Sequence, residues 1–179
     1  MHSLEASETC RPLKENARFS PLNGQLRSMI TVADIREPSV ADQIYVLQRA
    51  AYSVEAQWIG SADFPPLRET IDALRHCADH FLVFVETGNI IGCLSYEQRG
   101  ENVTITRLVV CPQHFRRGIA SALLRQLESR LPLGSVVFAS TADLNEPAIR
   151  AYEKQGYSTS AGPTLAGIKL RGLHKRLVG

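Results

Sequence analysis

The chain has 179 residues, of which 44% are hydrophobic and 21% are charged, a composition typical of one globular domain with a single core. Its net charge of +2 is too small to favour binding to nucleic acid or to a membrane. No apolar run approaches the roughly 18 residues of a membrane span, and no hydrophobic segment follows the N-terminus as a secretory signal would.

The four cysteines are scattered and form no C-x-x-C pair: Cys10, Cys77, Cys93 and Cys111. This spacing argues against a zinc site and against a disulfide framework, so we expect no bound metal. It favours a reducing compartment, and the predicted location is therefore cytoplasmic.

The first 28 residues are polar and aperiodic, with Pro12, Pro21 and Gly24 as breakers. They are predicted to form a disordered tail, 1–28, ahead of a single domain, 29–179. Met29 begins the first strand-like segment and is an alternative start of the protein that the sequence does not decide.

Periodicity and turn residues predict the elements of the first half of the domain. In order they are a strand at 30–36, a helix capped by Ser39 and ending near Gln57, a helix from Arg68 to about Ala78, and hairpin strands at 81–85 and 90–96. The segment Phe64-Pro65-Pro66-Leu67 breaks the chain before the second helix.

The second half begins with a strand that ends near Val110, a loop opened by Pro112 and a helix starting around Arg116. A short buried strand at 136–139 follows, then a helix with Pro147 near its start and Gly156 past its end. Segments 157–160 and 165–173 close the chain as a hairpin. The strands near Val109 and Val137 are expected to run parallel and side by side.

The junction between the strand ending at Val110 and the following helix carries chemistry. Gly118 lets the backbone approach a ligand, and the first N–H groups of the helix have no internal partner. These donors, the helix dipole and the cations Arg116 and Arg117 predict a pyrophosphate site. The alternative is an ordinary strand–loop–helix corner with two solvated arginines.

Residues 110–120 read Val-x-Pro-x-x-x-x-x-Gly-x-Ala, which resembles motif A of the GNAT N-acetyltransferase superfamily. The resemblance extends over about residues 30–177. It implies an α/β fold with a mixed, mostly antiparallel sheet of about seven strands and helices on both faces. It also implies acetyl-CoA as the acyl donor, bound by Leu108, Val109, Val110, Arg116, Arg117, Gly118, Ile119, Ala120, Ser121 and Asn145. One departure is Phe115, which stands where the family usually has Gln or Arg.

The segment from Asn145 to Tyr157 resembles motif B of the same superfamily. Asn145 and Tyr152 lie seven residues apart, two helical turns, so both can face one groove. The resemblance implies that Asn145 hydrogen-bonds the pantetheine arm and that the Tyr152 hydroxyl reaches the thioester sulfur. Without the resemblance, Asn145 reads as a helix cap and Tyr152 as a core aromatic.

The implied reaction is direct attack of an amine on the thioester in a ternary complex. The amine must lose a proton, because alkylamines have pKa values near 10. A backbone N–H near Val110 would stabilise the developing oxyanion, and Tyr152 would protonate the thiolate. Residues 104–110 contain no carboxylate, so the general base is left open among Glu97, Glu55, His114 and water.

Three functions remain open at this point. The first is an N-acetyltransferase acting on a small amine or a peptide amine, as a monomer or homodimer. The second is a non-catalytic acyl-CoA-binding or sensor module, favoured by the missing strand carboxylate. The third, a nucleic-acid binder using the basic C-terminal residues, is less well supported, because sheet edges commonly carry such charges. We therefore expect no nucleic-acid or membrane partner.

Overall fold

In the computed structural model, residues 28–61 and 63–179 are described. The strands are β1 (Ser28–Ala33), β2 (His80–Glu86), β3 (Asn89–Arg99), β4 (Asn102–Val110), β5 (Val136–Ala142), β6 (Ser158–Leu165) and β7 (Ile168–Arg176). The helices are α1 (Pro38–Ile59), α2 (Ile71–His76), α3 (Ile119–Glu128) and α4 (Glu146–Glu153). Short 3₁₀ turns occupy Pro65–Arg68 and Pro112–His114. Apart from Ser28, the predicted tail lies outside the described residues.

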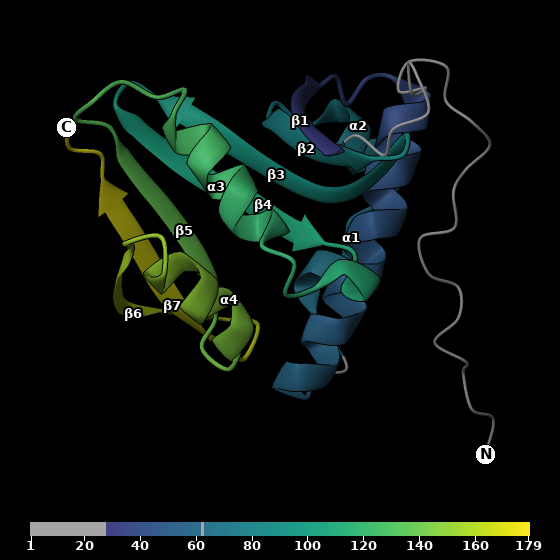
Figure 1. The fold of residues 1–179 in the computed structure, drawn as a ribbon. Coiled ribbons are helices and arrows are strands. Elements are labelled where there is room, and N and C mark those ends of the chain that lie inside the picture. Colours follow the sequence, from purple (N-terminus) through teal and green to yellow (C-terminus); the bar gives the residue numbers. More distant parts are fainter. Residues whose placement is uncertain (1–27, 62) are drawn as a thin grey trace.

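The strands form one seven-stranded sheet in the order β1-β2-β3-β4-β5-β7-β6. All neighbouring strands run antiparallel except β4 and β5, which are parallel. The mixed, mostly antiparallel sheet predicted from the sequence is therefore confirmed. Figure 1 shows β4 beneath α3, and β5 separating from it toward α4.

Helices cover both faces of this sheet. Neighbouring residues of β3, which point to opposite faces, show which helix covers which face. A Cβ added to Gly92 on β3 would lie 2.6 Å from Ile119 Cγ2, so the glycine allows α3 to pack directly on this face. The next residue, Cys93, points to the opposite face. There α1 and the segment before α2 cover the sheet, because Gln48 on α1 and Arg107 on β4 both contact Glu69.

Several helix and strand boundaries differ from the predictions, because caps, turns and strand pairing fall at other residues. Helix α1 begins at Pro38 with Glu37 as its N-cap, so the prediction that Ser39 caps it is wrong. Pro65-Pro66 form a separate 3₁₀ turn, and α2 begins only at Ile71, capped by the Thr70 hydroxyl. Strands β3 and β5 run three residues past their predicted ends, because ladder pairing continues there.

Helix α3 starts three residues later than predicted. Arg116 has φ 63° and Gly118 has φ 77°, both in the left-handed region, which interrupts a right-handed helix. Gly118 is the N-cap, and the first helical residue is Ile119. The loop after β4 is thus longer than the periodicity indicated.

No helix in the described ranges, 28–61 and 63–179, is both long and apolar enough to cross a membrane.

Candidate active site

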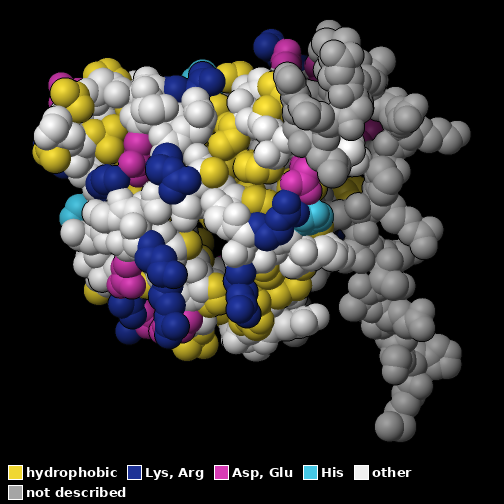
Figure 2. All heavy atoms as spheres, in the orientation of Figure 1, with side chains coloured by type: hydrophobic (Ala, Val, Ile, Leu, Met, Phe, Trp, Pro, Cys, Tyr) yellow, Lys and Arg dark blue, Asp and Glu magenta, His cyan; other side chains and the backbone are white. Residues whose placement is uncertain are grey.

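Strands β4 and β5 pair at one end only. The parallel register joins Asn102, Val103 and Thr104 to residues 136–138, and the pairing stops there. Val137 is therefore level with Val103, and the predicted neighbour Val109 lies beyond the paired end. Figure 2 shows a hollow between α3 and α4 on this side, with Lys and Arg side chains around it. The two parallel strands open into a cleft.

Backbone groups of β4 face this opening. The Cys111 N–H donates to the Ile91 carbonyl on β3 at 2.8 Å, and Gly92 opposes Val110. Because N–H groups alternate in direction along an antiparallel strand, Val109 pairs toward β3, whereas Leu108 and Val110 point toward β5. Within the described residues, β5 has no ladder contact at that level. The N–H of Val110 can therefore donate to a group in the cleft.

The loop after β4 presents a second set of donors. The first intrahelical hydrogen bond of α3 is donated by Ala122 to Gly118 at 2.9 Å, which leaves the N–H groups of Ile119, Ala120 and Ser121 without helical acceptors. A Cβ built on Gly118 would meet no atom within 4 Å, so the space above it is open. This end of α3 can therefore hold an anion.

The two arginines of the loop have different environments. Arg117 makes a bidentate ion pair with Glu86 at the end of β2, with Nη2–Oε1 at 2.6 Å and Nη1–Oε2 at 3.1 Å. This guanidinium lowers the pKa of the Glu86 carboxyl, and His114 lies 3.8 Å from the same carboxylate. Arg116 is exposed and makes no ion pair within the described part of the chain. Arg116 is the cation available to a ligand.

Phe115, the residue that departs from the family pattern, packs against α1. Its ring lies 5.9 Å from the Trp58 ring between centroids. Trp58 is in the last turn of α1 and remains 46% exposed. An apolar contact therefore joins the end of α1 to the loop that carries Gly118.

On the opposite side of the cleft, Asn145 is the N-cap of α4 and Tyr152 lies within this helix. The Asn145 side chain accepts from the Ala148 N–H at 3.2 Å, so it caps α4. Tyr152 is 4% exposed and makes an edge contact with Tyr157, with ring centroids 5.1 Å apart. Burial raises the Tyr152 pKa, and Tyr52 and Glu55 raise it further. The phenol is therefore protonated at neutral pH and can donate a proton.

The three candidate bases are far from equivalent. Glu55 accepts from the Thr141 hydroxyl at 3.5 Å and interacts electrostatically with Asn145 and Tyr152. Glu97 pairs with Arg99 and lies opposite Thr104, at the closed end of the cleft. His114 lies 3.8 Å from Glu86, in the loop between β4 and Gly118.

Sequence reasoning did not single out Tyr52 and Thr141. Tyr52 lies three residues before Glu55, so both share one face of α1, and this spacing was a usable signal. Thr141 was missed because β5 was predicted to end at Ala139. Burial raises the Tyr52 pKa, while the nearby Arg107 lowers it.

Arg107 anchors the segment that joins α1 to α2. Its side chain is 10% exposed and pairs with Asp79 at 2.7 Å and with Glu69. Glu69 also accepts from Gln48 on α1 at 2.7 Å. Breaking one partner of such a buried pair is costly, so this network fixes α1 against the sheet.

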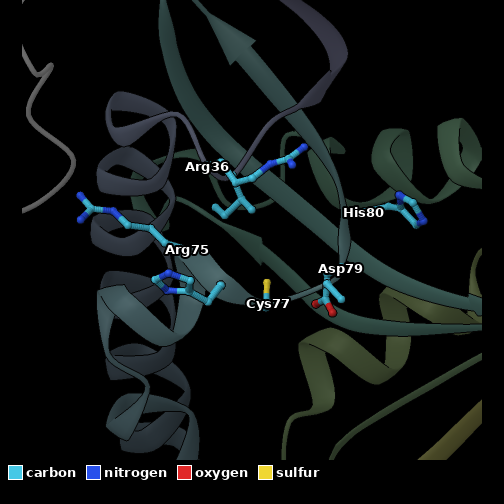
Figure 3. A pocket seen from close by; sticks show the side chains of 8 residues that line it. Arg36, Arg75, Cys77, Asp79 and His80 are labelled. Carbon is cyan, nitrogen blue, oxygen red and sulfur yellow. The ribbon is translucent and has the colours of Figure 1, made fainter.

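A separate pocket of about 640 Å³ lies beside the start of β2. Its lining residues are Ile35, Arg36, Arg75, His76, Cys77, Ala78, Asp79 and His80. Figure 3 shows that Arg75 and His80 extend in opposite directions, so these side chains do not converge on one ligand. Within the described residues, no three His, Cys, Asp or Glu side chains are grouped as a metal site. We assign no chemistry to this pocket.

The sheet thus opens between its two parallel strands, with helix N–H donors beside the opening. The model of the acetyltransferase (GNAT) family matches residues 41–157, and the chain belongs to this family. The matched range includes both motifs, so the predicted family membership is confirmed.

Individual relatives are more distant. The chain is 33% identical over 129 residues to the UPF0157 protein YqkA of Bacillus subtilis (strain 168), an alignment that covers 72% of this chain but 38% of that protein. Its fold is similar to PaiA N-acetyltransferase from Thermoplasma acidophilum in complex with coenzyme A, with TM-score 0.71, 15% identity and coverage of 84% of this chain and 99% of that one. It is also similar to the ribosomal-protein-S18-alanine N-acetyltransferase from Escherichia coli, with TM-score 0.64, 17% identity and coverage of 86% and 96%. At these identities the likeness shows a shared fold.

Proposed function

We propose that this protein transfers an acetyl group from acetyl-CoA to a primary amine of a small molecule or peptide, by direct attack in a ternary complex. The observation that carries the proposal is the end of β4–β5 pairing at Thr104, which leaves the Val110 N–H facing the cleft. The coenzyme A complex of the structurally similar PaiA N-acetyltransferase supports the choice of donor.

The described residues fit a bound acetyl-CoA at both ends of the cleft. The open space above Gly118, the N–H groups of residues 119–121 and the exposed Arg116 suit a pyrophosphate. The backbone groups of Leu108 and Val110 suit the amides of an extended pantetheine arm and a thioester carbonyl. Asn145 is held as a cap at the far wall and closes the same groove.

Acetyl-CoA would supply an activated acetyl group. The protein residues would bind and orient it and would protonate the departing sulfur. The N–H of Val110 would stabilise negative charge as it develops on the carbonyl oxygen. Tyr152, kept neutral by burial, would give its proton to the departing sulfur. A thiol has a pKa near 8.5, so this proton accelerates departure without being indispensable. No protein nucleophile is required.

The test combines binding and turnover. A thermal shift with acetyl-CoA is expected, because a ligand selective for the folded state stabilises it. Free CoA thiol should then appear when benzylamine, spermidine or a peptide with a free N-terminal alanine is added. Binding without CoA release across such a panel would instead indicate the acyl-CoA-binding module.

A further inference from the structure

We propose that Glu55 is the general base that removes the proton from the attacking amine. This inference rests on the proposed acetyltransferase function and deepens it. Three elements distant in sequence bring their side chains together here: Glu55 from α1, Thr141 from β5, and Asn145 and Tyr152 from α4.

The hydrogen bonds fix where the carboxylate lies. The Thr141 hydroxyl donates to Glu55 Oε1 at 3.5 Å across 86 residues of sequence. Asn145, the N-cap of α4, lowers the Glu55 pKa and so lies near the same carboxylate. Because β4–β5 pairing ends at Phe138, this contact with Thr141 places Glu55 at the open end of the cleft, where the thioester would face an incoming amine.

The surroundings make Glu55 a stronger base than an exposed glutamate. Burial raises the Glu55 pKa, and the hydrogen bonds from Asn145 and Thr141 oppose this rise in part. The titratable groups that face it are the Tyr52 hydroxyl on α1 and the Tyr152 hydroxyl on α4, both kept neutral by burial. A carboxylate with a raised pKa removes a proton more effectively than an ordinary surface glutamate.

Glu55 and Tyr152 together account for the protons transferred during the reaction. An ammonium substrate first loses one proton to solvent. As the N–C bond forms and the C–S bond breaks, Glu55 takes the second proton from nitrogen and Tyr152 gives its hydroxyl proton to sulfur. Glu55 then returns its proton to the Tyr152 phenolate through water. Both residues are restored, and the products are the N-acetyl amine and CoA thiol.

The decisive comparison is Glu55→Gln against Glu97→Gln. The amide introduced by Glu55→Gln keeps an oxygen that accepts from Thr141, whereas Glu97 is the alternative carboxylate at the closed end of the cleft. With benzylamine, spermidine and the alanine-terminated peptide as probes, E55Q is expected to lower kcat by about 100-fold to 10,000-fold. The KM for acetyl-CoA and the Tm should stay near the wild-type values. E97Q should be indistinguishable from wild type.

Two measurements distinguish a general base from a residue with a purely structural role. In the wild type, kcat/KM should rise with pH and show an inflection at a pH above the ordinary pKa range of glutamate. E55Q should lack this inflection. Carbon-13 NMR titration of the side-chain carboxyls, without acetyl-CoA, should show a raised pKa that disappears in E55Q.

Three outcomes would overturn the inference. The first is E55Q turnover within threefold of wild type, and the second is loss of Tm and acetyl-CoA affinity in parallel with turnover. The third is an NMR titration of Glu55 in the ordinary range. Each leaves the proposed function intact as long as the wild type acetylates a probe. A wild type that binds acetyl-CoA but acetylates none of the probes would instead overturn the proposed function, and the inference with it.

Discussion

Arg117 reaches back 31 residues to Glu86 and binds its carboxylate with both terminal nitrogens. The pair ties the loop before α3 to the end of β2, and it uses one of the two cations that the sequence offers to a pyrophosphate. The neighbouring Arg116, with its backbone at φ 63°, is exposed. The two adjacent arginines therefore have separate tasks: Arg117 holds the loop, and Arg116 is available to the ligand.

This division predicts unequal effects on acetyl-CoA binding. Arg116→Ala should raise the Kd for acetyl-CoA by about 10-fold or more, because a charge-assisted hydrogen bond to phosphate is lost. Arg117→Ala should raise it less and should lower the Tm, since Glu86 loses its partner. Calorimetric titration and thermal unfolding of both variants measure this difference. A larger Kd change for Arg117→Ala would show that Arg117 leaves Glu86 and contacts the ligand itself.

Gly118 should be essential to acetyl-CoA binding for a steric reason. Gly118→Val would fill the open space where the phosphates approach, and the thermal shift with acetyl-CoA should disappear. A positive φ strains any L-residue, so the variant needs a control for strain alone. Gly100→Val provides it, because Gly100 has φ 62° and equally open surroundings but lies at the other end of β4. An unchanged Kd in Gly118→Val would contradict the pyrophosphate assignment.

The sequence predicted the parts of the site that depend on local patterns. The end of β4 near Val110 and Asn145 as a cap follow from short-range periodicity and capping chemistry, whereas the left-handed residues that delay α3 to Ile119 were not predicted. The Glu86–Arg117 pair joins residues 31 positions apart, and the Glu55–Thr141 contact joins residues 86 apart. Such contacts are set by strand order and by where β5 ends, so no local pattern reveals them. The sequence could name Glu55 as a candidate base, but only the fold brings it to Tyr152.

The predicted domain boundary can be tested by truncation. Deleting residues 1–27 should preserve the Tm and the thermal shift with acetyl-CoA, because that segment has no periodic apolar face to bury. Deleting residues 1–33 should lower the Tm strongly, since it also removes β1 and its ladder with β2. A comparable loss of stability in both truncations would show that the first 27 residues contribute to the folded domain.

The last prediction concerns the hydroxyl of Tyr152. Tyr152→Phe removes a single oxygen and keeps the ring contact with Tyr157, so acetyl-CoA affinity should be nearly unchanged. Turnover should fall by roughly 10-fold to 1,000-fold if the hydroxyl protonates the departing thiolate, with the smaller loss expected for so good a leaving group. Because burial raises the Tyr152 pKa, the wild-type phenol stays protonated through the neutral range and remains a donor. The loss should shrink at high pH, where the thiolate leaves unassisted.

Tyr157→Phe is the matched control for Tyr152→Phe. It removes a hydroxyl from the same aromatic pair, on a residue that is also 4% exposed but interacts with Glu128 rather than with Glu55. Its turnover should match the wild type, and any effect should appear in the Tm. Steady-state and single-turnover kinetics at saturating acetyl-CoA measure both variants. If Tyr152→Phe keeps wild-type turnover with chemistry rate-limiting, Tyr152 is a core aromatic, and the proton on sulfur comes from water.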